Sequence, residues 1–152
     1  MPDNPNVPRI ITPEAEKIAR TVRTWLNDYP DLPTEIVDVE FLGEESGLAI
    51  MTTQAAYKTR QFILGDYEAQ YQFQIWCRNI PTTANERLLV DELLNNIAMW
   101  ATQNPPVLES PCRTMRVVQN TNAALIGRFE NGAEDHSINM TLIYEVTKYG
   151  YS

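Results

Sequence analysis

The fold of this chain is decided by the stretch Tyr67-Glu68-Ala69-Gln70-Tyr71-Gln72-Phe73-Gln74-Ile75-Trp76-Cys77-Arg78, in which apolar and polar side chains alternate. Only Trp76 is out of step. A period of two predicts a β-strand with one apolar and one polar face. At about 3.3 Å per residue the strand is roughly 40 Å long, about twice the common length, so we expect it to extend past the core of one domain.

The polar face of this strand consists mostly of glutamine, whereas the polar face of a solvated sheet usually carries Lys and Glu. We therefore expect another molecule to cover part of this face. The pattern points to assembly and not to catalysis.

Two further segments have helical periodicity, with apolar residues three or four positions apart. We expect Thr12 followed by Pro13 to start the first helix, which ends before Pro30, and Thr83 with Glu86 to form a capping box for the second. The apolar stripes are Ile18, Val22, Trp25 and Tyr29 in the first helix, and Leu89, Val90, Leu93, Leu94, Ile97, Trp100 and Ala101 in the second. We expect these stripes to pack on the apolar face of the long strand.

The remaining segments are mostly β-rich. Residues 36–41 and 47–51 are joined by a Gly-Glu-Glu-Ser connection that predicts a hairpin, and residues 52–66 lack a period, which predicts a loop or flap of about 15 residues. Residues 113–119, 123–129 and 136–148 predict three more strands, the last as long as the first, with hairpin signals at 120–122 and at Asn131-Gly132.

This order of elements predicts an α+β fold: a largely antiparallel sheet with two long strands and two amphipathic helices on one face. We expect one domain over residues 12–148, with the flap at 52–66. It is preceded by an extended, proline-rich arm at residues 1–11, which we expect to form no strand ladder, and followed by a tail at 149–152.

Composition limits the classes of partner. The chain has 152 residues, 12 basic and 20 acidic, with a net charge of −8 and a pI near 4.6, which argues against tight binding to nucleic acid. It has no apolar run long enough to cross a membrane, and its start lacks the pattern of a signal peptide. We expect a soluble protein made in the host cytoplasm, without membrane binding.

Catalytic motifs are absent from the sequence, and we expect no catalytic residues, no cofactor and no metal site. Cys77 and Cys112 are too few for a disulfide framework or a zinc site, and Cys77 lies on the apolar parity of its strand. His136, the single histidine, follows a turn beside Asp135, where we expect a turn-edge residue. We expect no joint catalytic role for these four residues.

Charged residues cluster by sign. Residues 35–45 carry five carboxylates and no base, which fits a solvated strand face better than a metal site, with Asp38 and Glu40 pointing to solvent. Three basic residues recur every third position on the first helix, which indicates either a solvated face or a strip that meets the acidic strip of a neighbouring copy. The candidate interface residues are Lys17, Arg20, Arg23, Asp38, Glu40, Glu44, Glu45, Lys58 and Arg60.

Several segments between Thr12 and Val146 together resemble the tail terminator family of long-tailed bacteriophages, also labelled minor capsid or tail completion proteins. They are Trp25-Leu26-Asn27-Asp28-Tyr29-Pro30, Phe41-Leu42-Gly43, Gly65-Asp66-Tyr67 leading into residues 72–78, a Leu-rich helix closing on Trp100, Arg113-Thr114-Met115 and residues 139–145. The motifs are patterns of apolar and turn residues. The chain departs from the family pattern in its proline-rich arm and in residues 52–66.

The resemblance implies a structural virion protein at the head–tail joint. Such a subunit forms a homo-oligomer, a hexameric ring on the tail tube protein, which stops tube growth and offers a surface to the head connector proteins. Two alternatives stay open. One is a host-type α+β binding domain with a pocket under the flap, and the other is a small hydrolase-like enzyme that uses Asp135, His136 and a cysteine.

Overall fold

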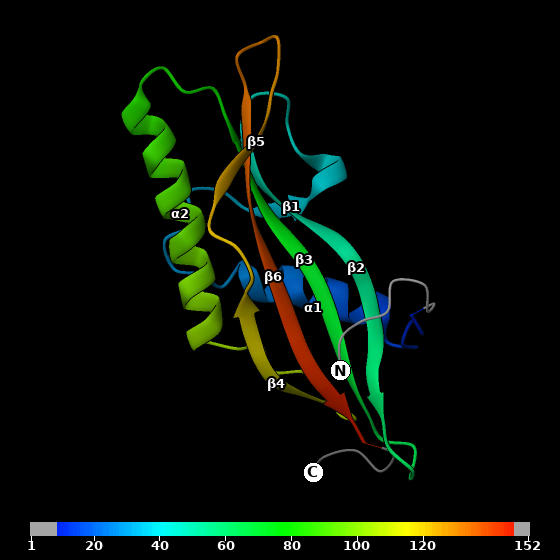
Figure 1. The fold of residues 1–152 in the computed structure, drawn as a ribbon. Helices are drawn as coiled ribbons and strands as arrows, with labels where there is room; N and C mark the ends of the chain where they lie inside the picture. The colour runs from blue at the N-terminus through cyan, green and yellow to red at the C-terminus, as the bar shows by residue number, and fades with distance from the viewer. Residues whose placement is uncertain (1–8, 148–152) are drawn as a thin grey trace.

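The alternating stretch forms β3 (Tyr67–Asn79), a central strand of the computed structural model, which describes residues 9–147. The described elements are α1 (Ala15–Leu26), β1 (Ile36–Asp38), the 3-10 helix η1 (Val39–Phe41), β2 (Gly47–Gln61), β3, α2 (Ala84–Gln103), β4 (Cys112–Gln119), β5 (Ala124–Arg128) and β6 (Glu134–Val146). The strand order is β1-β2-β3-β6-β4, and β5 also pairs with β6 (Figure 1). All pairs except β1–β2 are antiparallel.

The predicted α+β fold is confirmed: α1 contacts β2 and β3, and α2 contacts β4 and β6. Figure 1 shows α1 crossing behind the long strands and α2 running beside β6. The apolar parity of β3 is buried along its whole length, as the alternation predicts, with Phe73 and Ile75 fully buried. The two helices meet where the Trp25 and Trp100 rings stack, with centroids 5.9 Å apart.

Helix α2 begins as predicted, because the Thr83 hydroxyl accepts the Glu86 backbone N–H at 3.2 Å and a Glu86 carboxylate oxygen accepts the Thr82 N–H at 2.6 Å. The helix is rotated about its own axis relative to the expected orientation. Leu94 is fully buried, whereas Leu89 is exposed, so the expectation that Leu89 packs on β3 is wrong. Ala98, a small residue outside the predicted stripe, faces the core instead and lets the helix approach the sheet there.

Helix α1 begins at Ala15, three residues after the predicted cap. The Thr12 hydroxyl lies 3.1 Å from the Tyr144 hydroxyl, so it is engaged by the sheet and does not cap the helix. The carboxylate of Glu14 accepts the hydroxyls of Tyr67 and Tyr144, at 2.8 Å and 2.9 Å, which joins the start of α1 to β3 and β6. The predicted stripe of α1 is buried at Ile18, Val22 and Trp25.

The hairpin expected for residues 36–51 is wrong, because β1 and β2 are parallel neighbours: Ile36 aligns with Leu48 and Asp38 with Ile50. Residues 39–41 form η1 and not a continuation of the strand, which leaves Phe41 exposed. Asp38 shares the face of the buried Ile36 and points toward α1, so its expected position on the solvated face is also wrong.

The flap expected at residues 52–66 is wrong as well. Residues 52–61 continue β2, which pairs with β3 along 15 residues, and only 62–66 form the turn. The pairing contains three register shifts, between Thr52 and Gln54, Gln54 and Tyr57, and Lys58 and Arg60. Each bulge changes which parity faces the core, and this explains why a real strand shows no period in its sequence.

The C-terminal strands follow the prediction with one exception. The Asn131-Gly132 connection is a hairpin turn between β5 and β6, with Gly132 at φ +90°. Residues 120–122 do not form a hairpin, because β4 and β5 pair in succession with the same strand: Gln119 aligns with Met140 and Ala124 with Ser137.

Residues 1–8 of the expected arm and 148–152 at the C-terminus lie outside the described residues. The described end of the arm contradicts the expectation that it forms no ladder. The Lys58 backbone N–H donates to the Ile10 carbonyl at 2.8 Å, and Ile11 forms an antiparallel bridge with Tyr57. These contacts cover part of the free edge of β2.

Candidate subunit interface

The sheet face opposite the helices carries a ladder of uncharged, mostly polar residues. Between Glu68 and Arg78, the residues of this parity in β3 are three glutamines and Trp76, and their partners on β6 are likewise uncharged. The aligned pairs are Gln70 with Ile143, Gln72 with Thr141, Gln74 with Asn139, and Trp76 with Ser137. Within the described residues, neither helix covers this surface, which we call the amide face.

The glutamine side chains bond to aromatic residues of β2 and of β3 itself. Tyr57 on β2 donates its hydroxyl to Gln70 at 3.3 Å and accepts from Gln72 at 3.2 Å. The Trp76 indole donates to Gln74 at 2.8 Å. An amide network of this kind holds the side chains in place, and neutral groups cost less to remove from water than charges do. The amide face is therefore suited to contact with another protein.

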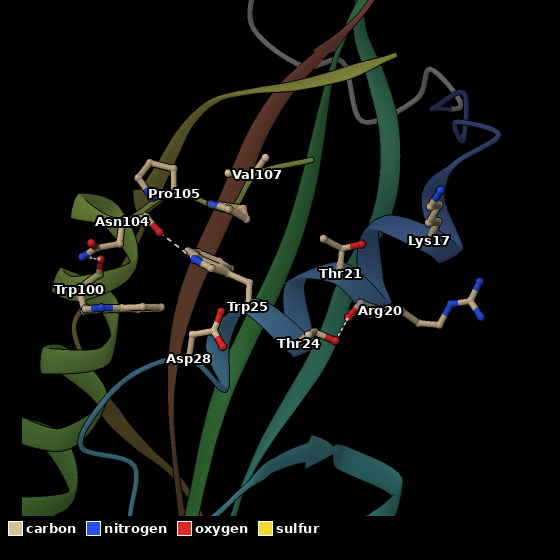
Figure 2. Close-up of a pocket in the computed structure, with 11 residues that line it drawn as sticks. Lys17, Arg20, Thr21, Thr24, Trp25, Asp28, Trp100, Asn104, Pro105 and Val107 are labelled. Carbon is tan, nitrogen blue, oxygen red and sulfur yellow. Dashed lines mark hydrogen bonds between the residues drawn. The ribbon is translucent and has the colours of Figure 1, made fainter. Parts of the chain in front are cut away.

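A groove of about 910 Å³ lies between α1 and the end of α2 (Figure 2). One end is aromatic and apolar, formed by the Trp25–Trp100 pair with Pro105 and Val107. The Trp25 indole N–H donates to the Asn104 carbonyl at 2.7 Å, which fixes the ring as the floor of the groove. Val107 is 93% exposed, so this apolar wall is open to a partner.

The other end of the groove is cationic. Figure 2 shows Lys17 and Arg20 on α1, directed away from the tryptophan pair. Lys17 forms an exposed ion pair with Glu109. The groove thus has a largely apolar end, which also carries the Asp28 carboxylate, and a basic end along the axis of α1.

The turn between β2 and β3 presents a run of three exposed apolar side chains, Phe62, Ile63 and Leu64. Ile63 is fully exposed and Leu64 is 74% exposed. The turn is closed by backbone bonds between Phe62 and Asp66 and by Gly65 at φ +94°. In Figure 1 it lies at the lower end of the sheet, beyond both helices. We call residues 62–66 the apolar tip.

Two of the three basic residues predicted for the interface pair within the chain. Arg23 donates to Asp38 at 2.5 Å, in a partly exposed ion pair that joins α1 to β1, and Lys17 pairs with Glu109. Arg20 lies at the groove. The structure therefore places the Arg23–Asp38 pair inside one subunit, where it fixes the position of α1 on the sheet edge.

The other charged residues predicted for the interface lie in two separate parts of the structure. Glu40 lies in η1, and Glu44 and Glu45 lie exposed before β2. Lys58 lies over the Tyr67 ring, 4.5 Å from its centroid, and Arg60 is aligned with Glu68 across the β2–β3 pair. The structure does not bring the acidic group together with Lys58 and Arg60.

His136 is buried, so its expected position at a turn edge is wrong. Its Nδ1 lies 2.7 Å from the Asp91 carboxylate on α2. Asp135 points to the opposite face, where Arg78 donates to both carboxylate oxygens at 2.7 and 2.8 Å. These two neighbours are not brought together as a catalytic pair.

Glu134, at the start of β6, forms an ionic cluster with two exposed arginine side chains. Its carboxylate accepts Arg87 Nε at 2.9 Å and Arg128 Nε at 3.0 Å, and the hydrogen bond from Arg87 lowers the pKa of the carboxyl group. The cluster ties α2, β5 and β6 together. Sequence reasoning missed it, because only the fold brings Arg87 and Arg128 to one carboxylate.

Both cysteines are buried, as expected for Cys77. Burial, with a further contribution from nearby carboxylates, raises the pKa of each thiol to about 11. A catalytic thiol needs a lowered pKa, so both thiols are shifted in the wrong direction for nucleophilic chemistry.

Within residues 9–147, no three His, Cys, Asp or Glu side chains are grouped so that they could hold a metal ion. No helix in this described part of the chain is long and apolar enough to cross a membrane.

The apolar tip was missed at the level of the sequence, although it had a signal. A run of three large apolar residues next to Gly65 is unusual in a turn unless a partner covers it. The sequence matches no family model, and no curated protein aligns with it at a significant level.

Proposed function

We propose that this protein is a structural subunit that forms a homo-oligomeric ring, and that it acts as a tail terminator of a long-tailed bacteriophage. In that role it caps the tail tube and presents a surface to the head connector. The amide face is the observation that carries the proposal. A protein with a net charge of −8 keeps a sheet surface free of charge over the middle of two neighbouring antiparallel strands, β3 and β6. Such a surface suits protein contact.

The sequence resemblance supports the finer part of the proposal. Its segments fall on the end of α1, on η1, on β3 and on β6, which are the elements that build the sheet and its helical cover. The exposed apolar tip and the open groove add two distinct surfaces for partners. A ring needs two different contact surfaces on each subunit.

The test is the mass of the purified protein in solution, alone and with purified tail tubes, together with electron microscopy of the tube ends. We expect a species of six times the 17.4 kDa chain mass and a ring at one end of each tube. The ring proposal fails if the protein stays monomeric at high concentration and on tail tubes alike. The tail terminator proposal fails if rings form but leave the tube ends bare and tube growth unchanged.

A further inference from the structure

We propose that His136 is a proton-dependent clamp: its charged imidazolium joins α2 to β6, and this attachment weakens as the pH rises. The residue is 3% exposed and its ring lies between two carboxylates. Its Nδ1 is 2.7 Å from Asp91 on α2, and its Nε2 is 3.6 Å from Glu134 on its own strand. The clamp lies within one chain and is independent of the proposed ring.

The contacts of the ring favour a proton on each of its nitrogens. An ionised carboxylate only accepts hydrogen bonds, so the contact of 2.7 Å with Asp91 requires a proton on Nδ1. In a neutral ring, Nε2 is then a bare acceptor next to the Glu134 carboxylate, which is also an acceptor. Within residues 9–147, Nε2 is buried and has no hydrogen-bond partner. A second proton removes this mismatch, because it places the positive charge of the ring between two carboxylates.

Two arginines near the ring oppose this charge. Arg87 on α2 and Arg128 on β5 both bind Glu134, and their side chains are 47% and 63% exposed. Water and salt therefore screen them more than they screen the buried ring. Asp91 is not shared with an arginine, since the described part of the chain gives its carboxylate no ion-pair partner other than His136.

The remaining titratable groups do not change this balance. On β3, Cys77 is aligned with His136, and burial raises the pKa of its thiol to about 11, so the thiol is uncharged at neutral pH. Asp135 and Arg78 point to the opposite face of the sheet and pair with each other.

The pH dependence follows from the two carboxylates. An unfolded histidine releases its proton near about pH 6.5, whereas both carboxylates favour the protonated ring in the folded chain. The stability that the clamp contributes is therefore complete at acid pH, where both states carry the proton. It is lost on the alkaline side, as the folded chain releases the proton too.

His136 is the single histidine of the chain, so nitrogen-15 NMR observes its ring without overlap. At about pH 7.5, we expect both ring nitrogens to be protonated in the folded protein and only one in the urea-unfolded protein. Urea denaturation from about pH 6 to about pH 8.5 gives a second measurement. The equilibrium constant for unfolding should rise with pH, by at most about tenfold per pH unit for one proton.

Two variants test the assignment to the carboxylates. Asp91→Asn and Glu134→Gln each remove one negative charge beside the ring, so we expect the ring to release its second proton at a lower pH in both. Glu92→Gln is the matched control, because it removes the same charge at the next position of α2, where the side chain is exposed. We expect this variant to keep the parental NMR titration. The ring signals are measured on folded protein, so a change in stability does not imitate the effect.

The clamp is overturned if the folded parent has only one protonated ring nitrogen at about pH 7.5. It is also overturned if the unfolding constant stays the same between about pH 6 and about pH 8.5. Equal ring titrations in the parent and in both carboxylate variants would contradict a charge held by Asp91 and Glu134.

Discussion

Leu94 is the side chain that best tests the packing of α2, because it is fully buried in the middle of the helix. Burying a leucine contributes about 1.5 to 3 kcal/mol, and the cavity left by its removal adds to the loss. We expect Leu94→Ala to lower the free energy of unfolding by about 3 kcal/mol. For a domain of this size that is a fall of roughly 9 °C in melting temperature. Urea denaturation followed by circular dichroism measures the change.

Leu89→Ala is the matched control, since it makes the same substitution on the same helix at a position 53% exposed. We expect a change within about 0.5 kcal/mol. The denaturant slope should be equal in both variants, so that the midpoints report stability. A larger loss for Leu89→Ala than for Leu94→Ala would refute an orientation of α2 that buries Leu94 and exposes Leu89, and would restore the orientation centred on the predicted stripe.

Three further predictions concern the charged and titratable groups. The hydrogen bond from Arg87 lowers the pKa of Glu134 in the folded state, so this carboxylate stabilises the fold above the ordinary glutamate pKa of about 4.3. That stability is lost as the pH falls through the lower pKa of the folded state. Glu134→Gln should therefore reduce the loss of stability between pH 7 and pH 3, measured by urea titration. Cys77, with its pKa raised to about 11, should react with a disulfide reagent at pH 8 only after denaturation, and fast reaction of the native protein would contradict its burial. The partly exposed Arg23–Asp38 pair should show a coupling of about 0.2 to 1 kcal/mol in a double-mutant cycle with alanine, and the coupling should decrease in high salt. Zero coupling at low salt would contradict a stabilising contact in solution.

The sequence predicts those elements whose side chains keep one period from end to end. In β3 the apolar parity is buried without a break, and Trp76, the one residue out of step, lies on the polar face as its position requires. The start of α2 was predictable because its capping box is local in sequence. Here local preference and tertiary burial agree.

Prediction failed where a tertiary contact overrides the local pattern. Bulges in β2 change its parity, so residues 52–61 of this strand resembled a loop. Thr12 has the sequence context of a helix cap, but its hydroxyl lies beside Tyr144, which is 132 residues away. Asp38 alternates with valines as a solvated residue does, yet it faces Arg23 because β1 lies parallel to β2 under α1.

The candidate interface was likewise predictable from the sequence only in part. The uncharged character of the amide face is visible in the sequence, because all its central β3 residues lie on one parity. The groove is not visible there, since its apolar walls come from two helices and meet only through the Trp25–Trp100 contact. Sequence reasoning also assigned Arg23 and Asp38 to contacts between copies, although they pair within one chain.

The amide face lies on the side of the sheet opposite the groove between α1 and α2. We propose that this face contacts the tail tube. Gln72→Lys with Gln74→Lys places two like charges on it, and a charge held against a protein surface without a partner is costly. We expect the double variant to keep the parental ring mass but to lose binding to purified tail tubes in a sedimentation assay. Gln72→Asn with Gln74→Asn, which keeps both amides, is the control and should bind. Loss of the ring in the lysine variant would instead place the amide face between subunits, and unchanged tube binding would show that neither partner uses it.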